Sequence, residues 1–182
     1  LIKKFPEIKI PNKFYKNNGN LTFSDEDGLI DGNGPTYSNG AVYADFDNDG
    51  DLDIVVNNID DPVLVYENKS ADSVKECLEI NLIGPGKNRN AIGAKVVLFS
   101  GNEIRTYENF PVKGFLSSMQ APLHIGLKNT KIDSLFLIWP DRSFQRLSVI
   151  GNTQKISYQK GLPFFDFSLL TKFTANHTLH AA

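Results

Sequence analysis

The sequence predicts an all-β protein. Short runs rich in β-branched and aromatic residues recur along the chain, and most of them are bounded by glycine, asparagine or proline. Such runs are typical of strands that are separated by turns. No segment shows the long period of 3.6 residues that marks an amphipathic helix. We therefore expect short strands and tight turns throughout.

The expected strands can be placed in order along the chain. The first pair is a hairpin over residues 13–23, centred on Asn18-Gly19, a dipeptide favoured in tight hairpin turns. Later strands are expected at residues 63–68, 77–84, 94–100, 103–110, 134–140 and 154–160. The spacing of the strands beyond residue 73 predicts a β-sandwich-like unit in this part of the chain.

A partial repeat in the first third of the sequence predicts part of a β-propeller. The stretch FYKN at residues 14–17 recurs as VYEN at residues 65–68, so that Tyr15 and Tyr66 lie 51 positions apart. This offset is near the period of propeller blades. Because a single blade cannot bury both of its faces, about three or more repeats are needed for a stable stack. We expect the chain to hold about one blade and edges of its neighbours.

Composition limits the classes of function. The 182 residues are 41% hydrophobic and carry 19 basic and 21 acidic side chains, which is typical of a globular chain of one or two domains. Lys87, Arg89 and Lys95 are the nearest approach to a basic cluster, so no nucleic-acid partner is expected. The single cysteine, Cys77, excludes an internal disulfide and is predicted to be a buried apolar residue. No apolar run reaches the length of about 18 residues typical of a membrane span, so none is expected in this segment.

The most informative stretch is ADFDNDGDLDIVVNN, residues 44–58. Five aspartates alternate with other residues on either side of Gly50: Asp45, Asp47, Asp49, Asp51 and Asp53. The spacing places carboxylates at loop positions 1, 3, 5 and 9, with glycine at position 6, where a sharp turn folds such a loop around one point. Five carboxylates so close together need a cation to offset their charge.

Calcium is the cation that fits this spacing best. Ca²⁺ takes about six to eight oxygen ligands in irregular cages, whereas Mg²⁺ demands a tighter octahedron. We predict ligation by the side chains of Asp45, Asp47, Asp49 and Asp53 and by the backbone carbonyl of Asp51. An EF-hand is excluded, because position 12 is Val56 rather than glutamate and the flanking residues do not resemble helices. The alternative is an acidic turn solvated by water.

Two sets of motifs resemble known families. The acidic loop, with YKNNGNLTF (residues 15–23) and YSNGAVYA (37–44) before it, resembles the FG-GAP or VCBS repeat of calcium-bound β-propellers. Residues 88–101, 113–127 and 132–141 resemble the ASPIC/UnbV domain, known from cartilage acidic protein and from large bacterial surface proteins. That family usually has glycine after WPD, where this chain has Arg142.

The resemblance implies three regions: a propeller-blade segment at residues 1–72, an ASPIC/UnbV domain at 73–161, and a tail at 162–182 that resembles the start of a further repeat. It implies a secreted or cell-surface protein, associated with the outer membrane if bacterial, with calcium as a structural ion. The function implied is adhesion, or the binding of an extracellular protein or glycan.

Catalysis is not expected. The sequence contains no GxSxG, HExxH, paired CxxC or phosphate-loop motif. Asp60 and Asp61 are adjacent, and neighbouring strand residues point to opposite faces, so they make a poor acid–base pair. His124 and Trp139 are predicted to be structural. The alternative function is an accessory binding part of an extracellular glycan-processing enzyme.

Overall fold

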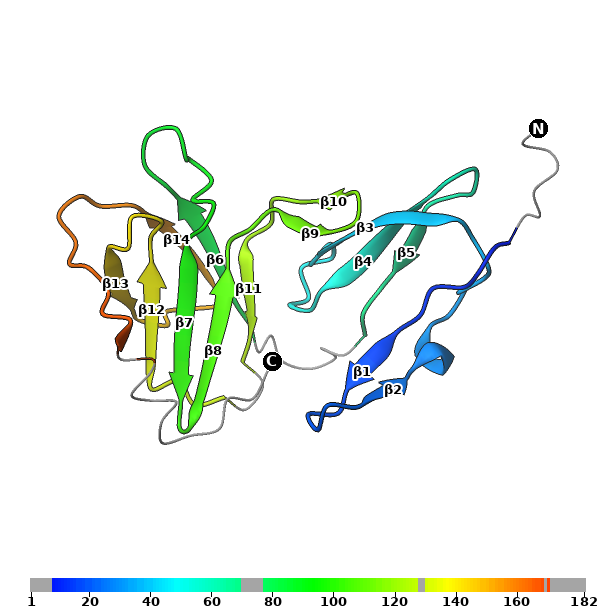
Figure 1. Ribbon diagram of the computed structural model, residues 1–182, viewed down its shortest axis with the longest axis horizontal. Helices are drawn as coiled ribbons and strands as arrows, with labels where there is room; N and C mark the ends of the chain where they lie inside the picture. The colour runs from blue at the N-terminus through cyan, green and yellow to red at the C-terminus, as the bar shows by residue number, and fades with distance from the viewer. Residues whose placement is uncertain (1–7, 70–76, 128–129, 169, 171–182) are drawn as a thin grey trace.

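The computed structural model describes residues 8–69, 77–127, 130–168 and 170, and nearly all of the regular structure in them is β (Figure 1). The N-terminal strands are β1 (Tyr15–Asn17), β2 (Phe23–Asp25), β3 (Ser38–Ala44), β4 (Asp53–Asn58) and β5 (Leu64–Tyr66). A short 3-10 helix, η2 (Asp27–Leu29), follows β2. The predicted all-β class is confirmed.

Strands β3, β4 and β5 form one antiparallel sheet with β4 in the centre. The β-branched run Ile54–Val56 occupies β4, as its composition favours. Strands β1 and β2 form a separate hairpin, whose turn is closed by a hydrogen bond of 3.0 Å from Asn18 N–H to the carbonyl of Thr22. The hairpin predicted at Asn18-Gly19 is therefore present. We call residues 8–69 the blade region.

The blade region has almost no apolar core of its own. Val56 is its one buried apolar side chain among the described residues. Outside the acidic loop, ten large apolar side chains of this region are exposed: Ile8, Ile10, Phe14, Tyr15, Leu21, Phe23, Leu29, Ile59, Val63 and Val65. Phe46, in the acidic loop, is exposed as well. This exposure agrees with the expectation that a single blade does not bury its own faces.

The C-terminal half is a two-layer sandwich (Figure 1). One sheet has the order β11-β6-β14, formed by Leu123–Gly126, Cys77–Ile83 and Thr153–Ser157. The other has the order β13-β12-β7-β8, formed by Phe144–Leu147, Ser134–Ile138, Lys95–Ser100 and Glu103–Glu108. The predicted β-sandwich-like unit is confirmed, and we call residues 77–168 the sandwich.

The sandwich buries apolar residues between its sheets and also on one outer face. The inner core contains Leu78, Ile80, Ala91, Ala94, Val96, Leu98, Leu123, Ile125, Leu135, Leu137, Trp139 and Leu147. Alternate residues of β7 and β12 point outward instead, where Val97 and Ile138 pack with Phe165 from the segment after β14. Trp139 is 1% exposed and meets Tyr158 edge-to-face at 5.4 Å, so its predicted structural role fits.

A small hairpin joins the two halves. Strands β9 (Val112–Gly114) and β10 (Ser117–Ser118) pair with each other and reach the free edge of β3 (Figure 1). Ala41 N–H donates to Ser117 Oγ at 2.9 Å. Tyr43 N–H approaches Met119 Sδ at 3.5 Å. The hairpin therefore occupies two alternate N–H groups on the edge strand of the blade region.

Candidate metal centre

The acidic loop connects β3 to β4. The antiparallel register pairs Ala44 with Asp53, so residues 45–52 leave the sheet and return to it at one place. Gly50 adopts φ 99°, a left-handed conformation that costs glycine little. Asn48 adopts φ 63°, which asparagine tolerates better than most residues. The chain can therefore turn back on itself within a few residues, as the spacing predicts.

Three of the five carboxylates come together. One ligand oxygen from each of Asp45, Asp47 and Asp49 lies within 4.8 Å of the other two. Two oxygens on the same Ca²⁺, each at about 2.3 to 2.6 Å, can be at most about 5 Å apart. The separation therefore allows one ion to contact all three side chains. No other group of three metal-binding side chains occurs in the ranges that the structure describes.

Backbone N–H groups hold these carboxylates in place. Asp45 accepts hydrogen bonds of 3.0 Å from the N–H groups of both Asp49 and Gly50. Asp49 in turn accepts one of 3.0 Å from Asp51 N–H. An ionised carboxylate offers about four lone-pair sites, so these bonds leave capacity for a cation. These local hydrogen bonds thus order the loop and leave lone pairs on the carboxylate oxygens free to bind a cation.

Asp53 has a different environment from the three clustered residues. Its side chain is 3% exposed, and its two oxygens accept hydrogen bonds from Phe46 N–H at 3.0 Å and Asn68 N–H at 2.9 Å. It thereby ties the start of the loop to the segment after β5. Asp51 is also buried, at 8% exposed. Ligation stays a prediction for all five residues, and the structure brings together the carboxylates of Asp45, Asp47 and Asp49 but not those of Asp51 and Asp53.

The surroundings of Asp47 oppose the ionisation of its carboxyl group. Partial desolvation raises the pKa of Asp47 above its usual value, and the negative charges of Asp49, Asp53 and Asp45 raise it further, against a hydrogen bond from Asp49 N–H. Because the pKa of Asp47 is higher in the folded than in the unfolded chain, ionisation of this group lowers the stability of the fold once the pH rises above the unfolded-state pKa. A bound cation reverses that penalty, since it favours the charged form.

The donor set fits a hard cation. All predicted ligands are carboxylate or carbonyl oxygens, and softer metals prefer the nitrogen and sulfur donors that this loop lacks. If calcium binds, the side chains of Asp45, Asp47 and Asp49 hold it between the ends of β3 and β4. The ion then supplies positive charge where the chain has concentrated negative charge.

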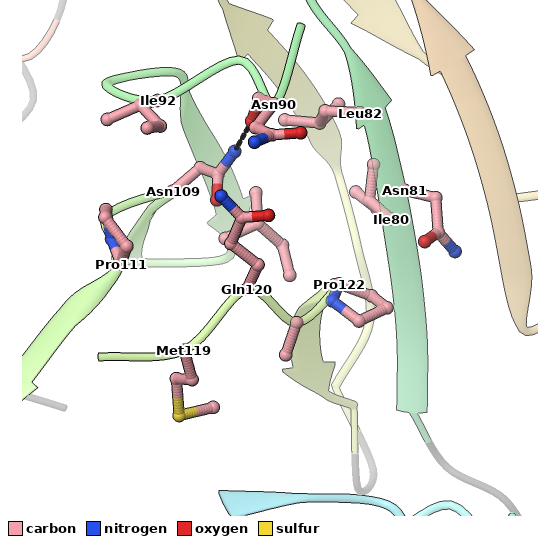
Figure 2. A pocket seen from close by; sticks show the side chains of 12 residues that line it. Ile80, Asn81, Leu82, Asn90, Ile92, Asn109, Pro111, Met119, Gln120 and Pro122 are labelled. Atoms are coloured by element: carbon pink, nitrogen blue, oxygen red, sulfur yellow. Dashed lines mark hydrogen bonds between the residues drawn. The ribbon is translucent and has the colours of Figure 1, made fainter. Parts of the chain in front are cut away.

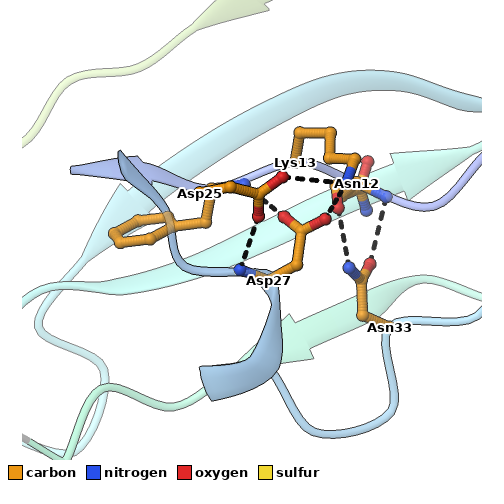
Figure 3. Close-up of polar contacts among 6 residues, drawn as sticks. Asn12, Lys13, Asp25, Asp27 and Asn33 are labelled. Carbon is orange, nitrogen blue, oxygen red and sulfur yellow. Dashed lines mark hydrogen bonds and ion pairs between the residues drawn. The ribbon is translucent and has the colours of Figure 1, made fainter. Parts of the chain in front are cut away.

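A second polar cluster, at the base of the β1–β2 hairpin, was not predicted from the sequence (Figure 3). Lys13 pairs with Asp27 and, at 3.2 Å, with Asp25. The hydrogen bond to Asp27 contributes most, and that to Asp25 next, to raising the pKa of Lys13 to about 12. Asn12 N–H donates to Asn33 Oδ1 at 3.0 Å, and the Asn33 amide returns a bond of 2.7 Å to the Asn12 carbonyl. Because the Lys13 ammonium group pairs with both aspartates and offsets part of their charge, this cluster has a structural role in the hairpin.

The same cluster connects the hairpin to the three-stranded sheet. Tyr66 on β5 accepts a bond of 3.0 Å from Asn12 Nδ2 and donates one of 3.1 Å to Asn33. Tyr66 lies 33 positions from Asn33 and 54 from Asn12. No local pattern in the sequence could have identified these partners.

The remaining candidates have structural contacts. Asp61 accepts a hydrogen bond of 2.7 Å from Lys9, and this bond lowers the pKa of its carboxyl group. Asp60 is exposed and has φ 58°. Cys77 is 5% exposed in β6, in agreement with the buried apolar role predicted for it. Arg142, where glycine was expected, has φ 69°, so the turn keeps a conformation that suits glycine.

Each half of the chain contains a match to a known family. Residues 11–56 match the FG-GAP-like repeat, which includes the whole acidic loop. Residues 84–161 match the ASPIC and UnbV family and cover most of the sandwich. The order of the two matches is the one that the motifs predicted. No curated protein matches the chain.

Proposed function

We propose that this chain, in which an FG-GAP-like repeat is followed by an ASPIC and UnbV domain, is a non-catalytic extracellular binding module whose blade region is stabilised by calcium. The observation that carries the proposal is the approach of three carboxylate oxygens, from Asp45, Asp47 and Asp49, to within 4.8 Å of one another. Calcium is a structural ion in this proposal, and the bound partner is an extracellular protein or glycan.

The role of the ion follows from linkage between binding and folding. An unfolded chain does not gather the three carboxylates, so the free energy of calcium binding adds to the stability of the folded loop. At a calcium concentration 100 times the Kd, the gain is about 2.7 kcal/mol. The blade region needs such a contribution, because Val56 is its one buried apolar side chain among the described residues.

A binding role agrees with the chemistry of the rest of the chain. Two matched domains of an extracellular type, both β-rich, support a location outside the cytoplasm or at the cell surface. Within the described residues, no helix is long and apolar enough to cross a membrane. Asp61 is paired with Lys9 rather than with a second carboxyl group, which is unlike the acid–base pair of a glycosidase.

The alternative proposal is an accessory binding part of an extracellular glycan-processing enzyme. A glycan array followed by a turnover assay on any glycan that binds separates the two proposals. Binding without product supports the non-catalytic module. Product formation by this chain contradicts it.

Calorimetric titration of the chelator-treated protein with Ca²⁺ tests the metal. We expect saturable binding by the wild type and a loss of affinity of at least about tenfold in Asp49→Asn, because affinity at such sites depends on the number of charged ligands. The amide retains an oxygen to accept the hydrogen bond from Asp51 N–H, so the loop keeps its shape. Asp60→Asn, an exposed aspartate outside the cluster, is the matched control and should bind as the wild type does. Equal affinity in wild type and Asp49→Asn would contradict the site.

A further inference from the structure

A pocket at one end of the sandwich has no role in the account so far. Its volume is about 170 Å³, which is larger than one water needs and smaller than the roughly 300 Å³ at which drug-sized sites begin. It lies where the loop before β7, the end of β8 and the segment before β11 meet β6 (Figure 2). Its size suits one ring-sized unit of a ligand.

The pocket combines an apolar floor with an amide rim. Ile80, Leu82 and Leu123, which belong to the sandwich core or pack against it, line the floor. The side chains of Asn90, Asn109 and Gln120 gather on one side, whereas Asn81 points away from them (Figure 2). The remaining lining residues are aliphatic, proline or methionine: Ile92, Pro111, Met119, Ala121 and Pro122.

The rim amides differ in how firmly they are held. The amide nitrogen of Asn109 donates to two backbone carbonyls, at 2.7 Å to that of Asn90 and at 3.1 Å to that of Ala91. This orients the Asn109 side-chain oxygen as a fixed acceptor. In the described part of the chain, the side chains of Gln120 and Asn90 make no hydrogen bond, so each has donors and an acceptor to offer a ligand.

The lining excludes several ligand classes. No lining residue is charged, so phosphate, sulfate or carboxylate groups find no ionic partner there. A wholly apolar ligand would desolvate the amides without replacing their hydrogen bonds, which costs free energy. A peptide cannot add a strand at β6, because β6 already has β11 on one side and β14 on the other. What remains is a neutral ligand with hydroxyl groups on its edge and an apolar face.

We propose that this pocket binds one unit of a neutral polyhydroxylated ligand, the chemistry of a sugar ring in a glycan. The hydroxyl groups exchange hydrogen bonds with Asn90, Asn109 and Gln120, while the C–H face of the ring packs on the half-buried side chain of Leu82. The inference rests on the proposed function as a binding module and names the ligand class and the site. It does not depend on the calcium loop, because the pocket lies wholly within the sandwich.

The test is an NMR titration of the full chain with methyl glycosides of glucose, galactose and N-acetylglucosamine. The expected result is a saturable shift of the side-chain amide signals of Asn90, Asn109 and Gln120 with at least one glycoside. Gln120→Ala and Asn90→Ala are each expected to weaken that binding by about three- to tenfold, as the loss of one hydrogen bond predicts. Asn102→Ala, an exposed asparagine outside the pocket, is the matched control and should leave the affinity unchanged.

Three outcomes overturn the proposal. The first is that no glycoside shifts these signals, and the second is that the shifts survive both pocket variants. The third is that a neutral tripeptide binds there and the glycosides do not. A calcium titration of the same sample separates this inference from the proposed function: calcium binding without glycoside binding refutes the pocket alone, and the reverse refutes the calcium role alone.

Discussion

The blade region and the sandwich have similar strand chemistry and very different cores. The sandwich encloses an inner apolar cluster that includes Leu78, Val96 and Leu135 at 0% exposed, and it also covers one outer sheet face. The blade region buries Val56 and leaves Val65 64% exposed. Apolar burial stabilises the sandwich. The described part of the blade region depends instead on polar contacts, the hairpin at its edge and, in our proposal, calcium.

The largest expected difference between the regions is the response to truncation of an apolar residue. Leu137→Ala, at a fully buried position in the sandwich, is expected to cost about 2–5 kcal/mol of unfolding free energy through lost packing and a cavity. Val65→Ala, on β5, should change it by less than about 0.5 kcal/mol, because the side chain is already in solvent. Denaturant unfolding followed by the fluorescence of Trp139 measures the first, and hydrogen exchange of the β4 and β5 amides measures the second. Equal costs at the two positions would break the comparison.

A glycine pair tests how closely the sandwich is packed. A Cβ added at Gly84 would lie 2.1 Å from the carbonyl oxygen of Asn88, so the backbone must move, and Gly84→Ala should cost about 1–3 kcal/mol. Gly126→Ala is the matched control, because among the described residues no atom beyond its two chain neighbours lies within 4 Å of the added Cβ. Its melting temperature should stay near that of the wild type. Comparable losses of unfolding free energy in the two variants would show that the close approach of Gly84 to Asn88 is not the cause of the destabilisation.

The hairpin between the two regions gives a smaller and local prediction. Ser117→Ala removes the oxygen that accepts the Ala41 N–H bond, which should cost about 1–3 kcal/mol at the junction. Hydrogen exchange at the amides of Ala41 and Tyr43 should accelerate, and exchange in the inner core should not. Ser118→Ala, at the exposed neighbouring position, is the control. Unchanged exchange at Ala41 would show that the β9–β10 hairpin does not stabilise the edge of the blade region.

The smallest expected effect is at Arg142, where the sandwich tolerates strain. Its φ of 69° is costly for a residue with a Cβ, so Arg142→Gly should raise the unfolding free energy by up to about 1 kcal/mol. Arg142→Ala removes the side chain but keeps the Cβ, so it should give no such gain. Thermal unfolding of the three proteins distinguishes relief of strain from loss of the arginine side chain.

The features that the sequence predicts are those with local signals. The turn at Asn18-Gly19, the strands with β-branched runs and the spacing of Asp45, Asp47 and Asp49 each depend on residues close together in the chain. The loop could be anticipated because its ligands, its glycine and its backbone hydrogen bonds all lie within nine residues.

The features that the sequence does not predict depend on distant partners. Three sets of contacts join residues from 33 to 76 positions apart: Tyr66 with Asn12 and Asn33, β6 with the parallel strand β14, and Ser117 with Ala41. Phe165 packs on the outer face of the sandwich, where the sequence gives only a resemblance to a further repeat. The predicted limits at residues 72 and 161 and the tail at 162–182 stay predictions. Residues 70–76, around the first limit, and residues 171–182 of the tail lie outside the described part of the chain.

The central claim is that calcium stabilises the blade region and not the sandwich. Hydrogen exchange of the full chain with saturating Ca²⁺ and with chelator tests it residue by residue. We expect calcium to slow exchange at Val42, Ile54 and Val56 on β3 and β4, and to leave the amides of Val96 and Leu135 unchanged. Asp49→Asn should abolish the difference. Protection that is the same in calcium and chelator at β3 and β4, or a calcium effect that is equal in both regions, would contradict the claim.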